Sequence, residues 1–224
     1  FSLADSAADG HTITYAAHPG EVPVVSSGVP IRGWRKLRDD PAGLPTAAAG
    51  RLWVADVPPE LDRFFTLYDG QERLPRARGE GFAPRDAPGQ KTLPDRIAFP
   101  PGALRNWPDL PDGELLVIPT ADYEMSILPL AAVDEGAGIA TTAFPASRPI
   151  GPVKFVPTSV WVENVLAVLD EPGEWVLHAA ERKLYLWPRG ERPGDQLVAP
   201  RLTELIRVEG KIAYDGPSDV PVRG

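Results

Sequence analysis

Residues 172–188 read PGEWVLHAAERKLYLWP and contain the clearest β-hairpin pattern in the chain. Two short runs, Glu174–His178 and Lys183–Trp187, are rich in apolar and aromatic residues, and the four residues Ala179–Arg182 join them. Such runs on either side of a short connection are typical of paired antiparallel strands. Pro172 and Gly173 precede the first run and end the element before it. We therefore expect a two-stranded hairpin here.

Similar short runs of apolar and aromatic residues continue along most of the chain, so the predicted fold class is all-β. Further strands are expected at Arg51–Val57, Phe64–Tyr68, Gln71–Ala77, Leu115–Ile118, Ser126–Val133, Gly138–Phe144, Leu197–Ala199 and Leu205–Val208. The dipeptide Asp69-Gly70 suits a hairpin turn, because glycine accepts a positive φ. Residues 79–113 are rich in glycine, proline and charge, and they are expected to form a long surface loop.

One short helix is predicted over Thr158–Asp170. Its apolar side chains Trp161, Val165, Leu166 and Leu169 follow the 3.6-residue period of a helix face. A helix bundle is excluded, because the 224-residue chain contains 27 prolines and 21 glycines. Each proline inside a helix costs about 3 kcal/mol.

The charge and cysteine content exclude several partners and sites. A net charge of −8 disfavours nucleic acid, which is bound mainly through Lys and Arg on phosphates. The one compact basic cluster consists of Arg32, Arg35, Lys36 and Arg38. Asp39 and Asp40 follow it at once, so we expect this stretch to be a solvated loop. The absence of cysteine removes disulfides and thiolate metal sites. No apolar run reaches the roughly 20 residues of a membrane span, so no membrane partner is expected.

Most recognisable catalytic chemistry is missing. His11, His18 and His178 are isolated from one another in the sequence, and none has the H-x-x-x-H or H-x-H spacing that places two imidazoles on one metal. A structural role is the simplest interpretation of His18 and His178. There is no G-x-S-x-G elbow, no dinucleotide-binding glycine motif and no phosphate loop. No metal and no cofactor are therefore expected.

A few aromatic and acidic residues have the character of sugar contacts. Glu124 follows a tyrosine and Glu163 lies between Trp161 and Asn164, so aromatic rings that could stack on a sugar are close in sequence. Two tryptophans, Trp34 and Trp107, lie in stretches rich in proline, glycine and charge, where an exposed platform is plausible. Packing or capping would explain the same residues. The candidate substrate-binding residues are Trp34, Trp107, Glu124 and Glu163.

Several segments together resemble a known family. They are ITYAAHPGEVPVVSSG (13–28), IRGW (31–34), ERLPRAR (72–78), WVEN (161–164), LDEPGEW (169–175), LYLWP (184–188) and VAP (198–200). They resemble the N-terminal part of large secreted bacterial proteins with right-handed parallel β-helix repeats, similar to β-helix glycoside hydrolases of the fucosidase/xylanase type. Ser27 departs from the glycine expected in that turn, and His178-Ala179-Ala180 departs from the usual acidic-basic turn.

The resemblance implies three parts: first β-helix strands in residues 1–33, an inserted β-sandwich-like or β-barrel-like domain in 34–204, and a truncated return to the β-helix in 205–224. In such proteins the catalytic carboxylates lie on later coils, so no catalytic residue is assigned. The chain is then expected to be an inactive fragment of a secreted or periplasmic glycoside hydrolase that degrades polysaccharide. Its expected partners are a polysaccharide or oligosaccharide and the remainder of its own β-helix. Two alternatives stay open: a non-catalytic carbohydrate-binding or structural module, and a polysaccharide lyase.

Overall fold

The computed structural model describes residues 1–5, 7, 10–86, 92–120, 123–154 and 156–209. The chain divides into two compact units. One unit spans Gly28–Arg201, and the other combines Phe1–Ser27 with the chain from Leu202 onward.

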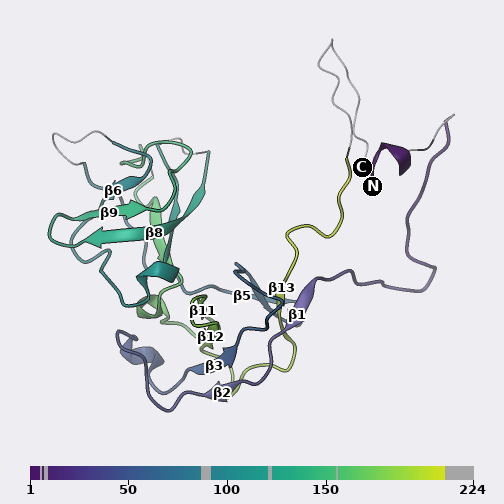
Figure 1. The fold of residues 1–224 in the computed structure, drawn as a ribbon, viewed down its shortest axis with the longest axis horizontal. Helices are drawn as coiled ribbons and strands as arrows, with labels where there is room; N and C mark the ends of the chain where they lie inside the picture. Colours follow the sequence, from purple (N-terminus) through teal and green to yellow (C-terminus); the bar gives the residue numbers. More distant parts are fainter. Residues whose placement is uncertain (6, 8–9, 87–91, 121–122, 155, 210–224) are drawn as a thin grey trace, which may run out of the picture. The chain divides into compact units, whose positions relative to one another are not determined.

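The Gly28–Arg201 unit consists of three antiparallel sheets (Figure 1). The first sheet has the order β1 (Gly28–Pro30), β13 (Leu197–Pro200), β4 (Leu67–Asp69) and β5 (Glu72–Leu74). The second has the order β10 (Val160–Glu163), β7 (Glu114–Val117), β8 (Ser126–Asp134), β9 (Ile139–Thr142) and β6 (Arg96–Ala98). The third has the order β11 (Trp175–His178), β12 (Lys183–Leu186), β3 (Trp53–Asp56) and β2 (Arg35–Lys36). Three single-turn 3-10 helices interrupt the strands: η2 (Thr46–Ala48), η3 (Leu110–Asp112) and η4 (Leu166–Val168). The all-β prediction is confirmed.

Both predicted hairpins are present. Strands β11 and β12 pair in register from Trp175 opposite Leu186 to His178 opposite Lys183. Strands β4 and β5 pair through the Asp69-Gly70 turn, where Gly70 has a φ of 60°. The local pattern of apolar residues and the residues of each turn were enough to predict these two hairpins.

The buried side chains form three clusters. The first lies on one face of the five-stranded sheet and contains Leu115, Leu128 and Val160 among others. The second contains Leu184 of the third sheet together with Leu197 of the first, so the two four-stranded sheets share a core. The third packs against the opposite face of the third sheet.

The helix predicted over Thr158–Asp170 is wrong. Residues Val160–Glu163 form strand β10, and only Leu166–Val168 adopt a 3-10 turn. Four valines in this stretch favour a strand, because β-branched side chains lose rotamer freedom in a helix. Asn164 has a φ of 61°, a left-handed conformation that ends the strand and interrupts any helix.

The prediction of a surface loop over residues 79–113 is also wrong. Within it, Arg96–Ala98 form strand β6, and Phe82, Phe99 and Leu104 are buried in the first cluster. The prolines and glycines form turns between these buried side chains. The composition of the stretch alone did not reveal that the three side chains are buried.

No parallel β-helix is evident in the described residues. Residues 1–27 hold one 3-10 turn, η1 (Leu3–Asp5), and no described residue of this stretch or of 202–209 lies in a strand. The expected return to the β-helix over 205–224 lies mostly outside the described residues. A strand requires a hydrogen-bonded partner, and β1 finds one in β13, antiparallel to it. In the unit that combines Phe1–Ser27 with the chain from Leu202 onward, the Glu209 amide donates to the Phe1 carbonyl at 2.8 Å.

Candidate functional site

The best candidate site is a groove of about 650 Å³, called here the Trp107 groove. Two chain segments form its walls, one after β5 and one between β6 and η3. Its lining consists of Gly43, Gly79, Glu80, Gly81, Phe82, Pro101, Gly102, Ala103, Arg105, Trp107, Val162, Ala167 and Val168.

The first wall is a chain segment that runs along the edge of strand β10. The Gly79 amide donates to the Val162 carbonyl at 2.9 Å, and the Phe82 amide donates to the Val160 carbonyl at 2.8 Å. Gly81 approaches closely enough that a β-carbon there would lie 2.3 Å from Nε1 of Trp161. Any side chain at this position would push the wall away from the strand.

The second wall positions Trp107. Its ring is half-buried and packs against the cluster of the five-stranded sheet. The neighbouring Asn106 amide donates to Oε1 of Glu135 at 3.0 Å, and the Leu110 amide donates to the Trp107 carbonyl at 3.1 Å. These bonds fix the backbone on both sides of Trp107, and packing against the cluster orients its ring in the absence of a ligand.

Polar groups of the groove are free to contact a ligand. Within the described residues, Nε1 of Trp107 has no hydrogen-bond partner, whereas the corresponding nitrogens of Trp34 and Trp175 donate to the carbonyls of Ile31 and Leu74. Arg105 and Glu80 also line the groove, and neither forms an ion pair with another described residue. The groove thus combines an aromatic ring with one donor and two charged groups.

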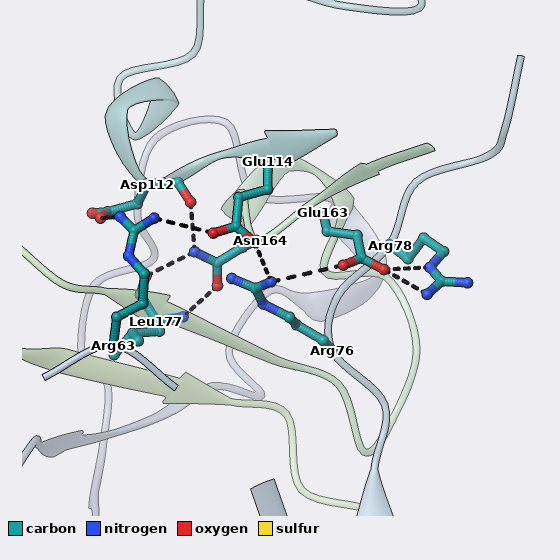
Figure 2. A network of polar contacts seen from close by, with 8 residues as sticks. All are labelled: Arg63, Arg76, Arg78, Asp112, Glu114, Glu163, Asn164 and Leu177. Carbon is teal, nitrogen blue, oxygen red and sulfur yellow. Dashed lines mark hydrogen bonds and ion pairs between the residues drawn. The ribbon is translucent and has the colours of Figure 1, made fainter. Parts of the chain in front are cut away.

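A network of charges surrounds two buried carboxylates, those of Glu114 and Glu163 (Figure 2). Glu114, whose side chain is 2% exposed, accepts from Arg76 at 2.5 Å and from Arg63 at 3.1 Å. Glu163 pairs with Arg78 at 2.5 Å and with Arg76 at 3.7 Å. We call these five residues the charge network. It attaches the chain segment after β5 to strands β7 and β10, which are the strands that support the first wall.

Asn164 provides a second connection at the same place (Figure 2). Its Nδ2 donates to the carbonyls of Asp112 and Leu177 at 2.7 and 2.9 Å, and its Oδ1 accepts from the Leu177 amide at 2.8 Å. The side chain is 2% exposed. One amide therefore joins η3, the end of β10 and strand β11.

The four sequence candidates do not converge on one site. Trp107 lines the groove, and Glu163 belongs to the charge network. Trp34 is half-buried and packs against the core shared by the two four-stranded sheets. Glu124 pairs with Arg148 at 3.5 Å, and its Oε2 is buried without a hydrogen-bond partner.

A histidine that the sequence had suggested to be structural lines a separate cleft of about 300 Å³. Nε2 of His178 lies 3.3 Å from Oδ2 of Asp109, which also accepts from the Leu166 amide at 2.6 Å. Burial opposes the charged imidazole most strongly of all single effects, but the hydrogen bond to Asp109 and the negative charges of Asp109, Asp112 and Glu181 together outweigh it and raise the pKa of His178. The pKa of Asp109 is lowered: its burial is outweighed by the bonds from His178 and Leu166. The two residues are 69 positions apart, so no local motif could have paired them.

The described part of the chain contains neither a metal site nor a membrane-spanning helix. No group of three or more His, Asp or Glu side chains could hold a metal ion there. Nor does any helix there have the length and apolar character needed to cross a membrane.

Comparison with known proteins gives one informative result. No family model matches the chain, and no curated protein matches it. A solved structure described as a glycoside hydrolase is similar to it with a TM-score of 0.58 and 18% sequence identity. The similarity covers 82% of this chain and 33% of that protein, so the chain spans about a third of the matched protein's length. At this identity the comparison establishes similarity of fold.

Proposed function

We propose that this chain is a carbohydrate-binding β domain of a glycoside hydrolase and that the Trp107 groove holds part of a polysaccharide or oligosaccharide. The observation that carries the proposal is the half-buried ring of Trp107, which lines the groove and whose indole N–H has no partner among the described residues. The similarity of fold to part of a glycoside hydrolase supports it.

The groove matches the chemistry of a sugar ring. The apolar C–H face of a pyranose can pack against the tryptophan, whose ring contributes a large contact area. Its hydroxyls can accept from Nε1 of Trp107 and from Arg105, and can donate to Glu80. Glycines at positions 79, 81 and 102 line the groove and present no side chain to a ligand.

The same proposal places hydrolysis elsewhere in a longer protein. A glycosidase needs two carboxyl groups that a substrate can reach, one of them as acid. The two carboxylates of the charge network, Glu114 and Glu163, are buried and held by arginines. They serve the architecture, and the catalytic pair would lie on further coils of a parallel β-helix, as the sequence resemblance implies.

The unit formed by both chain ends has the surface expected of an element that packs against such coils. Many of its described large apolar side chains are exposed, including Val22 at 90%, Val24 at 84% and Val208 at 71%. Covering such residues with the remainder of the β-helix removes apolar area from water. A secreted or periplasmic location, where polysaccharide is encountered, belongs to the same proposal.

The test is electrophoresis of the protein through gels that contain soluble plant or microbial polysaccharides. We expect at least one glycan to retard the wild type, Trp107→Ala to abolish the retardation, and Trp34→Ala to leave it intact. Equal retardation of all three proteins would refute the role of the groove. Release of reducing sugar by the isolated chain would refute the non-catalytic assignment, and absorbance of an unsaturated sugar would indicate a lyase.

A further inference from the structure

A second pocket lies at one end of the third sheet and has a different chemistry from the Trp107 groove. Its volume is about 520 Å³. The residues that define it, called here the cation pocket, are Lys36, Arg51, Trp53, Trp187 and Glu191. We infer that the cation pocket binds a sugar that carries a carboxylate, that is, a uronate residue of an acidic glycan.

The sheet itself places a cation next to an aromatic ring. Lys36 on β2 is directly opposite Trp53 on β3. Side chains of directly opposed residues project from the same face about 5 Å apart. The Leu37 amide, which donates to the Leu52 carbonyl at 3.0 Å, extends the pairing beyond this point. The Trp53 ring is partly exposed and can accept a sugar face while the ammonium lies at its side.

The second cation is held in position by its own turn. The Gly50 amide donates to both carboxylate oxygens of Asp40, at 2.9 and 3.0 Å, and Gly50 has a φ of 67°. The guanidinium of Arg51 lies over the ring of Trp187, 5.7 Å from its centroid. Trp187 is 8% exposed, and its amide donates to the Glu174 carbonyl at 3.0 Å. Arg51 therefore rests on a fixed surface, which lowers the conformational entropy lost on binding.

The charges of the pocket select an anion. Among the described residues neither Lys36 nor Arg51 forms an ion pair, although the whole protein has a net charge of −8. Glu191 is the one acidic residue of the lining and can accept a sugar hydroxyl. An arginine fork and an ammonium that line the same pocket suit a carboxylate, which accepts two parallel hydrogen bonds.

Other anions fit less well. Nucleic acid requires a row of cations along several phosphates and several stacked bases, whereas this pocket offers two cations. A free phosphate or sulfate would satisfy the cations and leave the Trp53 ring without a partner. A pyranose with a carboxylate uses both. This inference is independent of the Trp107 groove, since the two cavities share no lining residue.

The experiment is a titration of the full chain with trigalacturonate by isothermal calorimetry at low ionic strength, next to the fully methyl-esterified trimer. The ester keeps the rings and removes the charge. We expect the acid to bind, and the ester to bind about tenfold more weakly or not at all. Binding of the acid should weaken as salt is added.

Two conservative variants identify the site. Lys36→Gln and Arg51→Gln should each weaken binding of trigalacturonate about tenfold. Both side chains belong to exposed residues, so the fold should be unaffected, as a thermal unfolding curve would verify. Arg32→Gln is the matched control: it removes one exposed cation outside the pocket and should change nothing. Trp107→Ala should also bind trigalacturonate normally, which separates this inference from the proposed function.

Several results would overturn the inference: no binding of trigalacturonate, equal affinity for acid and ester, or unchanged binding by Arg51→Gln. Displacement of trigalacturonate by inorganic phosphate at comparable concentration would mean a general anion site. Displacement by a single-stranded oligonucleotide at lower concentration would mean a nucleic-acid site instead.

Discussion

Replacing Arg76 by methionine is the most informative test of how the fold is held together. Arg76 is 6% exposed at its side chain and contacts both carboxylates of the charge network, Glu114 at 2.5 Å and Glu163 at 3.7 Å. Its guanidinium also lies over the rings of Phe65 and Trp175, 5.4 and 5.7 Å from their centroids. Methionine keeps much of the packing and removes the charge.

The expected loss in the free energy of unfolding follows from the ion pairs that remain in the Arg76→Met variant. Without Arg76, Glu114 depends on Arg63 alone and Glu163 on Arg78 alone, and the last two arginines are 35% and 50% exposed. Breaking one partner of a buried ion pair costs about 3–5 kcal/mol, because a charge is left uncompensated. With a total stability of about 5–15 kcal/mol, this is a large fraction. With a slope of about 2–3 kcal/mol per M, the urea midpoint should fall by about 1–2.5 M.

The assay is urea unfolding followed by tryptophan fluorescence. All six tryptophans lie between positions 34 and 187, so the signal reports on the Gly28–Arg201 unit. The triple variant Arg76→Met, Glu114→Met, Glu163→Met should recover at least about 2 kcal/mol relative to the single variant, since no buried charge is stranded. Arg192→Met breaks the exposed pair with Asp195 and should cost less than about 1 kcal/mol. The reasoning would be refuted if Arg76→Met were as mild as Arg192→Met, or if the triple variant were the least stable.

Three further predictions concern single side chains. Asn164→Ala removes three buried hydrogen bonds and should lower the free energy of unfolding by about 3 kcal/mol in the same assay; a loss below about 1 kcal/mol would contradict the role of the amide. Gly81→Ala places a methyl group 2.1 Å from a threonine methyl, so the melting temperature should fall by about 3–10 °C, whereas Gly136→Ala meets only an ordinary contact at 3.5 Å and should leave it unchanged. The raised pKa of His178 contributes stability that is complete below the unfolded pKa of about 6.5 and is lost as pH rises through the higher folded value. The lowered pKa of Asp109 contributes stability that is lost only as pH falls through its folded value. His178→Asn should therefore flatten the decline in stability between pH 6 and 8, and an unchanged slope would mean that another group titrates.

The sequence predicted those elements that depend on neighbouring residues. The hairpin of β11 and β12 and the Asp69-Gly70 turn require only alternation and a glycine with positive φ, and both were identified correctly. The predicted helix over Thr158–Asp170 failed because its apolar spacing fits a helix face as well as a strand followed by a turn. What decides between them is the pairing of β10 with β7, more than 40 positions earlier, and that pairing is not a local property.

In the candidate site too, local features could be predicted from the sequence and long-range contacts could not. Trp107 could be proposed from its surroundings of proline, glycine and charge, and it does line a groove. Glu163 has aromatic neighbours in sequence as well, yet its carboxylate is buried against two arginines that lie about 85 positions away. The pairing of His178 with Asp109 and the approach of Lys36 to Trp53 also depend on sheet register, which a single sequence does not define.

Under the proposed function, stability and ligand binding depend on different side chains of this unit, and this separation has a physical basis. The charge network and Asn164 join strands, and most of their polar groups are already bonded to each other or to the backbone; the exception is Nε of Arg76, which is buried without a partner. Trp107, Arg105 and Lys36 lie at the ends of strands and in the loops beside them, where their polar groups have no partner in the described chain. A variant at Arg76 should therefore lose glycan binding only as far as it unfolds, whereas Trp107→Ala should lose binding with the fold intact. Binding by folded Arg76→Met at wild-type affinity, measured at low temperature without urea, is the result that this separation requires.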